Sequence, residues 1–212
     1  MKYYSILLDL KGRSAVVVGG GSVAERKVLS LIECSADITV ISPDATPVLK
    51  ELSKQKRIRL LKRDFTTDDL NGALMVIAAT SNRKVNTAVS YEAKKRGILV
   101  NVVDVPEECS FIVPSVVQRG DLLIAISTSG KSPAMAKKIR VELESLYGKE
   151  YELFLSMMGE IRARAMKDIK NESKRQGLFS SLVSSDILKL LKEGKVKEAE
   201  EEAERIYYRI KG

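Results

Sequence analysis

In the first half of the chain, short runs of apolar residues alternate with longer stretches in which apolar residues recur every three or four positions. Short apolar runs are typical of strands buried on both faces, and the longer period is typical of amphipathic helices. The pattern predicts strands over residues 14–19, 36–41, 57–62, 73–79 and 98–103, with helices over 22–33, 46–54 and 82–96. This alternation indicates an α/β fold with a doubly wound parallel sheet. A lead-in over residues 1–11 is expected to cover one sheet edge with its apolar side chains.

The pattern changes after residue 104. Residues 110–118 and 121–127 are β-rich and are separated by Arg119-Gly120, which predicts a hairpin. Helical periodicity follows and predicts helices over residues 132–147, 151–176, 182–193 and 196–210. We therefore expect an α/β domain over residues 1–112, a β-rich and helical segment over 113–148, and a C-terminal helical domain over 149–212.

Three consecutive glycines at residues 19–21 join the first predicted strand to the first predicted helix. Gly19, Gly21 and Ala24 fit the G-x-G-x-x-A pattern of the strand–turn–helix unit that binds dinucleotides in Rossmann domains. Gly19 permits the tight turn, Gly21 leaves room for a pyrophosphate, and Ala24 allows the helix to pack closely on the strand. The first amides of the helix would then face the phosphates. The simpler alternative is a Gly-rich turn in another type of α/β domain.

In an open parallel sheet, a ligand binds outside the carboxyl ends of the strands. An acidic residue after the second strand usually holds the ribose hydroxyls of NAD, and Asp44 is the carboxylate that follows that strand here. Because no Arg follows to bind a 2′-phosphate, NAD is favoured over NADP. The candidate cofactor-binding residues are Gly19, Gly21, Ser22, Val23, Ser42, Pro43, Asp44, Thr80 and Asn101.

Asp104 is the candidate catalytic residue. It follows the apolar fifth strand and precedes Val105-Pro106, so we expect it near the nicotinamide end of the cleft. The chain contains no His, so acid–base chemistry falls to carboxylates, Lys, Tyr, Cys or Ser. A carboxylate at this position can accept a proton while a hydride leaves to the cofactor. The alternative is that Asp104 only caps the turn before the proline.

A second candidate site lies in residues 126–133, which combine hydroxyls, a glycine, a lysine and a predicted helix start. Such a combination can bind an anion, here the carboxylates of a substrate. The alternative is that Ser132 only caps the helix. The candidate substrate-binding residues are Ser127, Thr128, Ser129, Lys131 and Ser132.

The net charge of +8 favours an acidic partner. Residues 1–112 contain 17 basic and 13 acidic side chains, and residues 113–212 contain 19 and 15, so each half carries +4. This even division, together with only 5% aromatic residues and no Trp, argues against a nucleic-acid partner. A small polyanionic substrate fits the charge better.

No apolar run is long enough to span a membrane, and the N-terminus does not have the pattern of a signal peptide. Cys34 and Cys109 have neither metal-binding nor redox spacing, and Cys109 is interpreted as a small buried residue. We therefore expect a cytoplasmic protein with reduced thiols, no membrane partner and no tightly bound metal.

Several segments occur in one order along the chain. They are Gly19-Gly20-Gly21-x-Val23-Ala24-x-Arg26-Lys27, Ala78-Ala79-Thr80, Asn101-Val102-Val103-Asp104-x-Pro106, Ser110-Phe111-Ile112-x-Pro114 and Ser127-x-x-Gly130-x-Ser132-Pro133. Together they resemble the siroheme synthase family in its precorrin-2 dehydrogenase form, over residues 5–145 and more loosely into the helical tail. The resemblance implies NAD-dependent oxidation of precorrin-2, a tetrapyrrole with many carboxylates, to sirohydrochlorin in siroheme biosynthesis.

The resemblance also implies that Asp104 is the catalytic aspartate and that the chain forms a homodimer through the segment after the Rossmann domain. It places Ser22, Val23, Pro43 and Asp44 at the cofactor. It leaves open whether the chain also acts as a ferrochelatase, and no methyltransferase domain fits in this length. The rival hypothesis is an NAD-sensing Rossmann regulatory module without catalysis, which would need only the first 110 residues. Residues 101–104 and 127–133 favour the enzyme.

Overall fold

The computed structural model describes residues 3–212, and the chain divides into two compact units, Met1–Val113 and Pro114–Gly212. The division lies close to the first expected domain boundary, at residue 112. The second expected boundary, at residue 148, falls inside the second unit and stays a prediction. Each unit is described below by itself.

The first unit contains a parallel sheet with the strand order β3-β2-β1-β4-β5. Its strands are β1 (Ser14–Val18), β2 (Asp37–Ile41), β3 (Arg59–Leu61), β4 (Met75–Ala78) and β5 (Leu99–Val102). The predicted α/β class is confirmed. The chain runs outward from β1 to β3 and then returns to β4 on the other side of β1. The carboxyl ends of β1 and β4 therefore form the switch point at which open sheets of this kind bind ligands.

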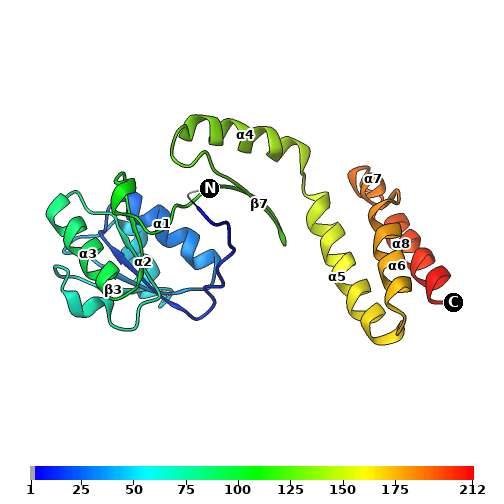
Figure 1. The fold of residues 1–212 in the computed structure, drawn as a ribbon, viewed down its shortest axis with the longest axis horizontal. Helices are drawn as coiled ribbons and strands as arrows, with labels where there is room; N and C mark the ends of the chain where they lie inside the picture. The colour runs from blue at the N-terminus through cyan, green and yellow to red at the C-terminus, as the bar shows by residue number, and fades with distance from the viewer. Residues whose placement is uncertain (1–2) are drawn as a thin grey trace. The chain divides into compact units, whose positions relative to one another are not determined.

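Helices cover both faces of this sheet (Figure 1). Successive side chains of a strand point to opposite faces, so Ala15 and Val17 of β1 pack in one apolar cluster and Val16 and Val18 in another. The first cluster includes apolar residues of α1 (Ser22–Glu33) and α2 (Pro47–Lys54). The second includes apolar residues of α3 (Arg83–Lys95) and of the short helix η1 (Thr67–Leu70). Strands buried on both faces explain the continuous apolar runs in the sequence.

The expectation for the lead-in is wrong. Tyr4, Ile6 and Leu7 are 92%, 65% and 77% exposed within this chain, and of the apolar side chains between residues 3 and 11 only Leu10 is buried. Residues 3–11 form no strand, so no ladder hydrogen bonds hold them against the sheet edge. Leu10 is held in place because backbone hydrogen bonds fix the turn that follows it. Arg13 N donates to Leu10 O, and Gly12 N donates to Ser35 O after α1, each at 2.9 Å.

The second unit begins with the predicted hairpin, formed by β6 (Ser115–Arg119) and β7 (Leu122–Ile126). Arg119 pairs with Leu122, so a two-residue loop joins the strands, and Gly120 adopts a φ of 54° there. The helix α4 (Pro133–Leu146) follows. A short helix, η2 (Pro106–Glu108), precedes the hairpin in the first unit.

The remaining helices are α5 (Glu150–Asp168), α6 (Glu172–Val183), α7 (Ile187–Lys192) and α8 (Val196–Lys211). A single helix over residues 151–176 is therefore a wrong prediction, because the chain breaks after Asp168. Ile169 has extended backbone angles and is buried, and the Asn171 carboxamide accepts a hydrogen bond from Lys174 N at 3.0 Å to start the next helix. An Asn that caps a new helix competes with continuation of the old one. Likewise, Leu182 belongs to α6, and the next helix starts only at Ile187.

Candidate active site

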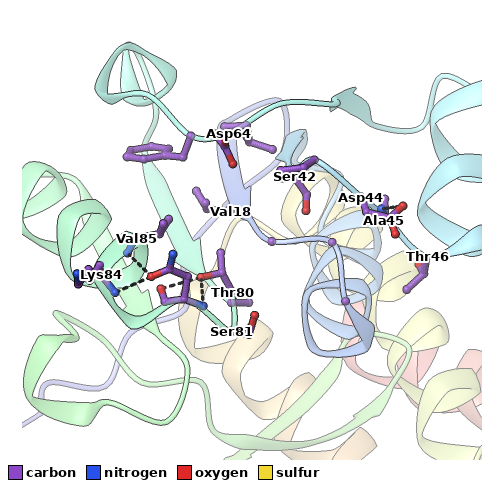
Figure 2. Close-up of a pocket in the computed structure, with 18 of the residues that line it drawn as sticks. Val18, Ser42, Asp44, Ala45, Thr46, Asp64, Thr80, Ser81, Lys84 and Val85 are labelled. Atoms are coloured by element: carbon purple, nitrogen blue, oxygen red, sulfur yellow. Dashed lines mark hydrogen bonds between the residues drawn. The ribbon is translucent and has the colours of Figure 1, made fainter.

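A cleft of about 1140 Å³ lies at the carboxyl ends of β1, β2 and β4, at the switch point of the sheet (Figure 2). Of the candidate cofactor-binding residues, the cleft is lined by Gly19, Gly21, Ser42, Pro43, Asp44 and Thr80. Ser22 and Val23 form the first turn of α1, directly after the glycines. Asn101 does not line the cleft. The cleft is about as large as the sites that hold extended organic cofactors.

The three glycines at the entrance of the cleft have different tasks. Gly19 has a φ of 126°, and a Cβ there would lie 2.5 Å from the carbonyl oxygen of Ala79. A Cβ on Gly20 would overlap the Asp44 carbonyl oxygen and lie 2.9 Å from Ala45 Cα. A Cβ on Gly21 would meet nothing within 4 Å. The first two glycines are therefore required by close backbone packing, whereas Gly21 faces the open space that a ligand would use.

The start of α1 offers backbone N–H groups to that space. Gly21 is its N-cap and provides no side-chain hydrogen bond. By contrast, Thr46 Oγ1 caps α2 and Asn82 Oδ1 caps α3. Free amides and the positive end of the helix dipole favour an anion at this point. The residues thus fit the pyrophosphate of a dinucleotide.

At the end of β2, Asp44 lies on the rim of the cleft with its side chain 91% exposed. Its Oδ1 accepts hydrogen bonds from Lys50 Nζ at 3.0 Å and from Ala45 N at 2.8 Å. These bonds, the one from Lys50 first, lower the pKa of the Asp44 carboxyl below its ordinary value. Asp44 is therefore held as an anion in the position expected for a partner of ribose hydroxyls, and Lys50 is a rim residue that the sequence did not reveal.

At the end of β4, Thr80 is fixed by Asn86, which the sequence analysis did not single out. Asn86 is buried on α3, and its Oδ1 accepts hydrogen bonds from Thr80 Oγ1 at 2.7 Å and Thr80 N at 3.2 Å. Its Nδ2 donates to Thr80 O at 3.0 Å. The turn that forms this wall of the cleft is therefore rigid before any ligand binds.

At the end of β5, residues 109–110 cover the open edge of the sheet. Val100 N donates to Ser110 Oγ at 2.8 Å, and Val102 N donates to Cys109 Sγ at 3.1 Å. Asn101 Nδ2 donates to Phe111 O at 3.1 Å, so this side chain holds the same loop. Cys109 is half-buried, and these bonds give it a structural task. They pin the loop that carries Asp104.

Asp104 itself has an exposed side chain and a φ of 61°. Within residues 3–212, its carboxylate accepts no hydrogen bond and forms no ion pair. A turn-capping carboxylate would accept a backbone N–H, so the geometry does not support that alternative. Asp is one of the few residues that tolerate the left-handed region. The loop thus presents an unpartnered carboxylate beyond the end of β5.

The loop over residues 127–132 lies in the second unit. Ser127 Oγ accepts a hydrogen bond from Ser129 N, and Thr128 Oγ1 accepts one from Ser132 N, each at 3.0 Å. Ser132 Oγ accepts one from Met135 N at 3.2 Å, so Ser132 does cap α4. The side chains of Ser129 and Lys131 are exposed and, among the described residues, have no hydrogen-bond partner.

A family model described as "Putative NAD(P)-binding" matches residues 6–115. The chain belongs to this NAD(P)-binding family. A second model, described as "Sirohaem biosynthesis protein central", matches residues 119–146. The two matches cover the sheet with its cleft, the hairpin and α4.

Individual proteins extend the similarity beyond these models. Over 192 residues the chain is 39% identical to a siroheme synthase of Methylobacillus flagellatus, covering 89% of this chain and 41% of that protein. Over 202 residues it is 35% identical to a siroheme synthase of Photobacterium profundum, covering 95% and 43%. The chain thus spans less than half the length of these relatives. The resemblance to the siroheme synthase family is confirmed.

A solved structure of SirC, precorrin-2 dehydrogenase, has a TM-score of 0.81 and 28% sequence identity to this NAD(P)-binding chain. The match covers 96% of this chain and 100% of that one. The similarity therefore includes the helical second unit, which the family models leave largely unmatched.

One charged residue of this NAD(P)-binding unit, Lys27, is not among the candidates that the sequence pattern indicates. Lys27, on the second turn of α1, is half-buried, and its charge interacts with that of Asp104. Burial, and then the neighbouring Arg26, lowers the pKa of the Lys27 ammonium below its ordinary value. The only signal in the sequence was its place after Arg26 in the glycine-rich segment.

No group of three or more His, Cys, Asp or Glu side chains that could hold a metal ion occurs in the described part of the chain. Over the same residues, no helix is both long enough and apolar enough to cross a lipid bilayer.

Proposed function

We propose that this chain catalyses the NAD-dependent dehydrogenation of precorrin-2 to sirohydrochlorin in siroheme biosynthesis. The observation that carries the proposal is that a cleft lined by the glycine-rich turn and a carboxylate without a partner among residues 3–212, Asp104, occur at the carboxyl edge of one parallel sheet. The similarity to SirC, precorrin-2 dehydrogenase, which covers 96% of this chain, supports the same reaction.

NAD, when bound, would accept the hydride. In this proposal the α1 amides and the open space at Gly21 hold its pyrophosphate. Asp44 accepts hydrogen bonds from the ribose hydroxyls, with Ser42 and Pro43 beside it on the rim. NAD is preferred to NADP because a 2′-phosphate would be placed against the Asp44 carboxylate. The preference is moderate, since Lys50 lies 3.0 Å from the same carboxylate.

Asp104 acts as the general base. Among the described residues, its carboxylate has no hydrogen bond to break before it accepts a proton from the macrocycle, and a positioned base contributes about a hundredfold or more. The reaction removes a hydride and a proton from precorrin-2 and extends its conjugation. Asn101 and Thr80 act at this end of the sheet: Asn101 holds the Asp104 loop, and Thr80 forms the neighbouring wall of the cleft.

The proposal extends to the second unit. Ser127, Thr128, Ser129, Lys131 and Ser132 form a loop that contacts carboxylates of the tetrapyrrole. The chain acts as a cytoplasmic homodimer that uses the hairpin segment, with no nucleic-acid or membrane partner. Exposed apolar side chains at Leu123, Met135 and Val141 in this segment support its use as an interface.

Anaerobic mixing of the protein with precorrin-2 and NAD tests the proposal. NADH should form with the spectrum of sirohydrochlorin, faster than with NADP at equal concentration. Calorimetry with NAD alone provides the comparison, because NAD binding without turnover would refute the dehydrogenase and favour the NAD-sensing module.

A further inference from the structure

The second turn of α1 places a lysine where the helix packs on the sheet. Ala24 and Val28, on the buried face of the helix, have no exposed surface, and Lys27 between them is half-buried. A partly desolvated ammonium group is costly unless it has a hydrogen-bond or ion-pair partner. Lysines without such partners are normally in water with their charged ends free.

Lys27 has no such partner within the part of the chain that the structure describes. It forms no ion pair within 4.0 Å, and its Nζ donates no hydrogen bond. Burial and the Arg26 guanidinium lower the pKa of the Lys27 ammonium, whereas Asp104 and Cys109 favour its charged form. The group is therefore a cation with unused donors, close enough to Asp104 to interact with it electrostatically without forming a salt bridge.

The packing explains why these groups are close. Val103 and Phe111, which flank the Asp104 loop, pack against the same apolar cluster as Ala24 and Val28 of α1. Val105 and Cys109 of the loop pack against the cluster on the opposite face, so the loop crosses the edge of the sheet and its two ends reach the side on which α1 lies. The bonds from Cys109 and Ser110 to β5 hold the loop, and neither Lys27 nor Asp104 takes part in them.

Lys27 does not line the dinucleotide cleft, so a cofactor phosphate is not the anion that its position fits. A ligand that reaches Asp104 would meet Lys27 beside it. Because the proposed substrate carries several carboxylates on the rim of its macrocycle, an unpaired ammonium next to the base can hold one of them by a charge-assisted hydrogen bond.

We propose that Lys27 is a substrate-binding residue, which binds a carboxylate of the tetrapyrrole and so places the macrocycle against Asp104. This inference rests on the proposed function. It assigns Lys27 to binding: its loss should act on the affinity for substrate and leave the chemical step and NAD binding nearly unchanged.

The test compares Lys27→Gln with Lys95→Gln, which removes the same charge from an exposed position on α3, on the other face of the sheet. Uroporphyrin, a stable porphyrin with eight carboxylates, is the binding probe in a fluorescence titration without cofactor. Lys27→Gln should weaken uroporphyrin binding and raise the KM for precorrin-2 about tenfold each, with kcat within about threefold of wild type. Lys95→Gln should behave as wild type, and Lys27→Arg should retain most of the affinity.

Unchanged uroporphyrin affinity and KM in folded Lys27→Gln protein would overturn the inference. So would a fall in kcat alone, because Lys27 would then act through Asp104. If Lys27→Gln lowers the melting temperature, Lys27→Met, which keeps the apolar stem, replaces it in both measurements. Wild-type protein that binds uroporphyrin through Lys27 but never oxidises precorrin-2 would refute the proposed function and leave this inference standing.

Discussion

Asp104→Asn separates a catalytic role for this residue from a structural one. The Asp104 carboxylate accepts no hydrogen bond within residues 3–212, so the substitution breaks none. Asn also tolerates the left-handed backbone that residue 104 adopts, at a φ of 61°. The melting temperature and the affinity for NAD should therefore stay close to wild type. The rate of precorrin-2 oxidation should fall about a hundredfold, which corresponds to about 2.7 kcal/mol of transition-state stabilisation.

A second variant, Asp104→Ala, provides the control. It removes the base in the same way, but Ala in a left-handed conformation costs about 1 kcal/mol, which lowers the melting temperature of a chain of this size by about 2–4 °C. The two variants should thus share one rate defect and differ in stability. Single-turnover rates and thermal melts on the same samples measure both quantities. Near-normal turnover in folded Asp104→Asn protein would remove Asp104 from the mechanism.

Three further predictions concern binding, stability and assembly. Gly20→Ala should unfold at lower temperature because its Cβ overlaps the 44–45 backbone, whereas Gly21→Val should keep most of the stability and lose NAD binding by calorimetry. The pKa of Asp168 is lowered first by Lys211, and that of Glu204 by Arg164. Both carboxylates therefore stabilise the fold at a pH above their unfolded-state pKa values, and this stabilisation is lost as the pH falls below about 4. Circular dichroism melts of Asp168→Asn should show a weaker dependence of the melting temperature on acid pH than wild type. Light scattering at micromolar concentration should give the mass of a dimer, and a monomer mass would contradict the proposed assembly.

Where neighbouring residues along the chain determine the structure, it could be predicted from the sequence. The helix α1 occupies the predicted residues 22–33, because a Gly-rich turn and an amphipathic period define both its start and its face. The pair Thr46-Pro47 begins α2 as predicted, since the Thr side chain accepts a backbone N–H and Pro needs none at the first position. The cleft residues after β1, β2 and β4 follow from the topology of an open parallel sheet.

Where contacts between distant segments determine the structure, it could not be predicted from the sequence. The requirement for glycine at position 20 comes from the backbone at residues 44–45, some 25 positions away along the chain. Asn86 fixes Thr80 from the next helix, and nothing in a helical pattern marks it as different from any other polar residue. The break between α5 and α6 at residues 169–171 depends on the cap that Asn171 provides. The spacing of apolar residues does not indicate this break, because it continues through these positions.

The loop after β5 shows how these two kinds of information combine at the site. An edge strand needs partners for its outward backbone groups, and here Ser110 and Cys109 provide them. Because those residues hold the loop, the structure does not depend on bonds from Asp104 or Lys27, and within residues 3–212 neither side chain has a hydrogen-bond or ion-pair partner, although the two charges lie close enough to interact. Because the Asp104 carboxylate is exposed to water and the Lys27 ammonium is only half-buried, a salt bridge between them would add little stability. In the proposed function, the free Asp104 carboxylate would accept the proton of the substrate, and the free Lys27 ammonium would bind one of the substrate's carboxylates.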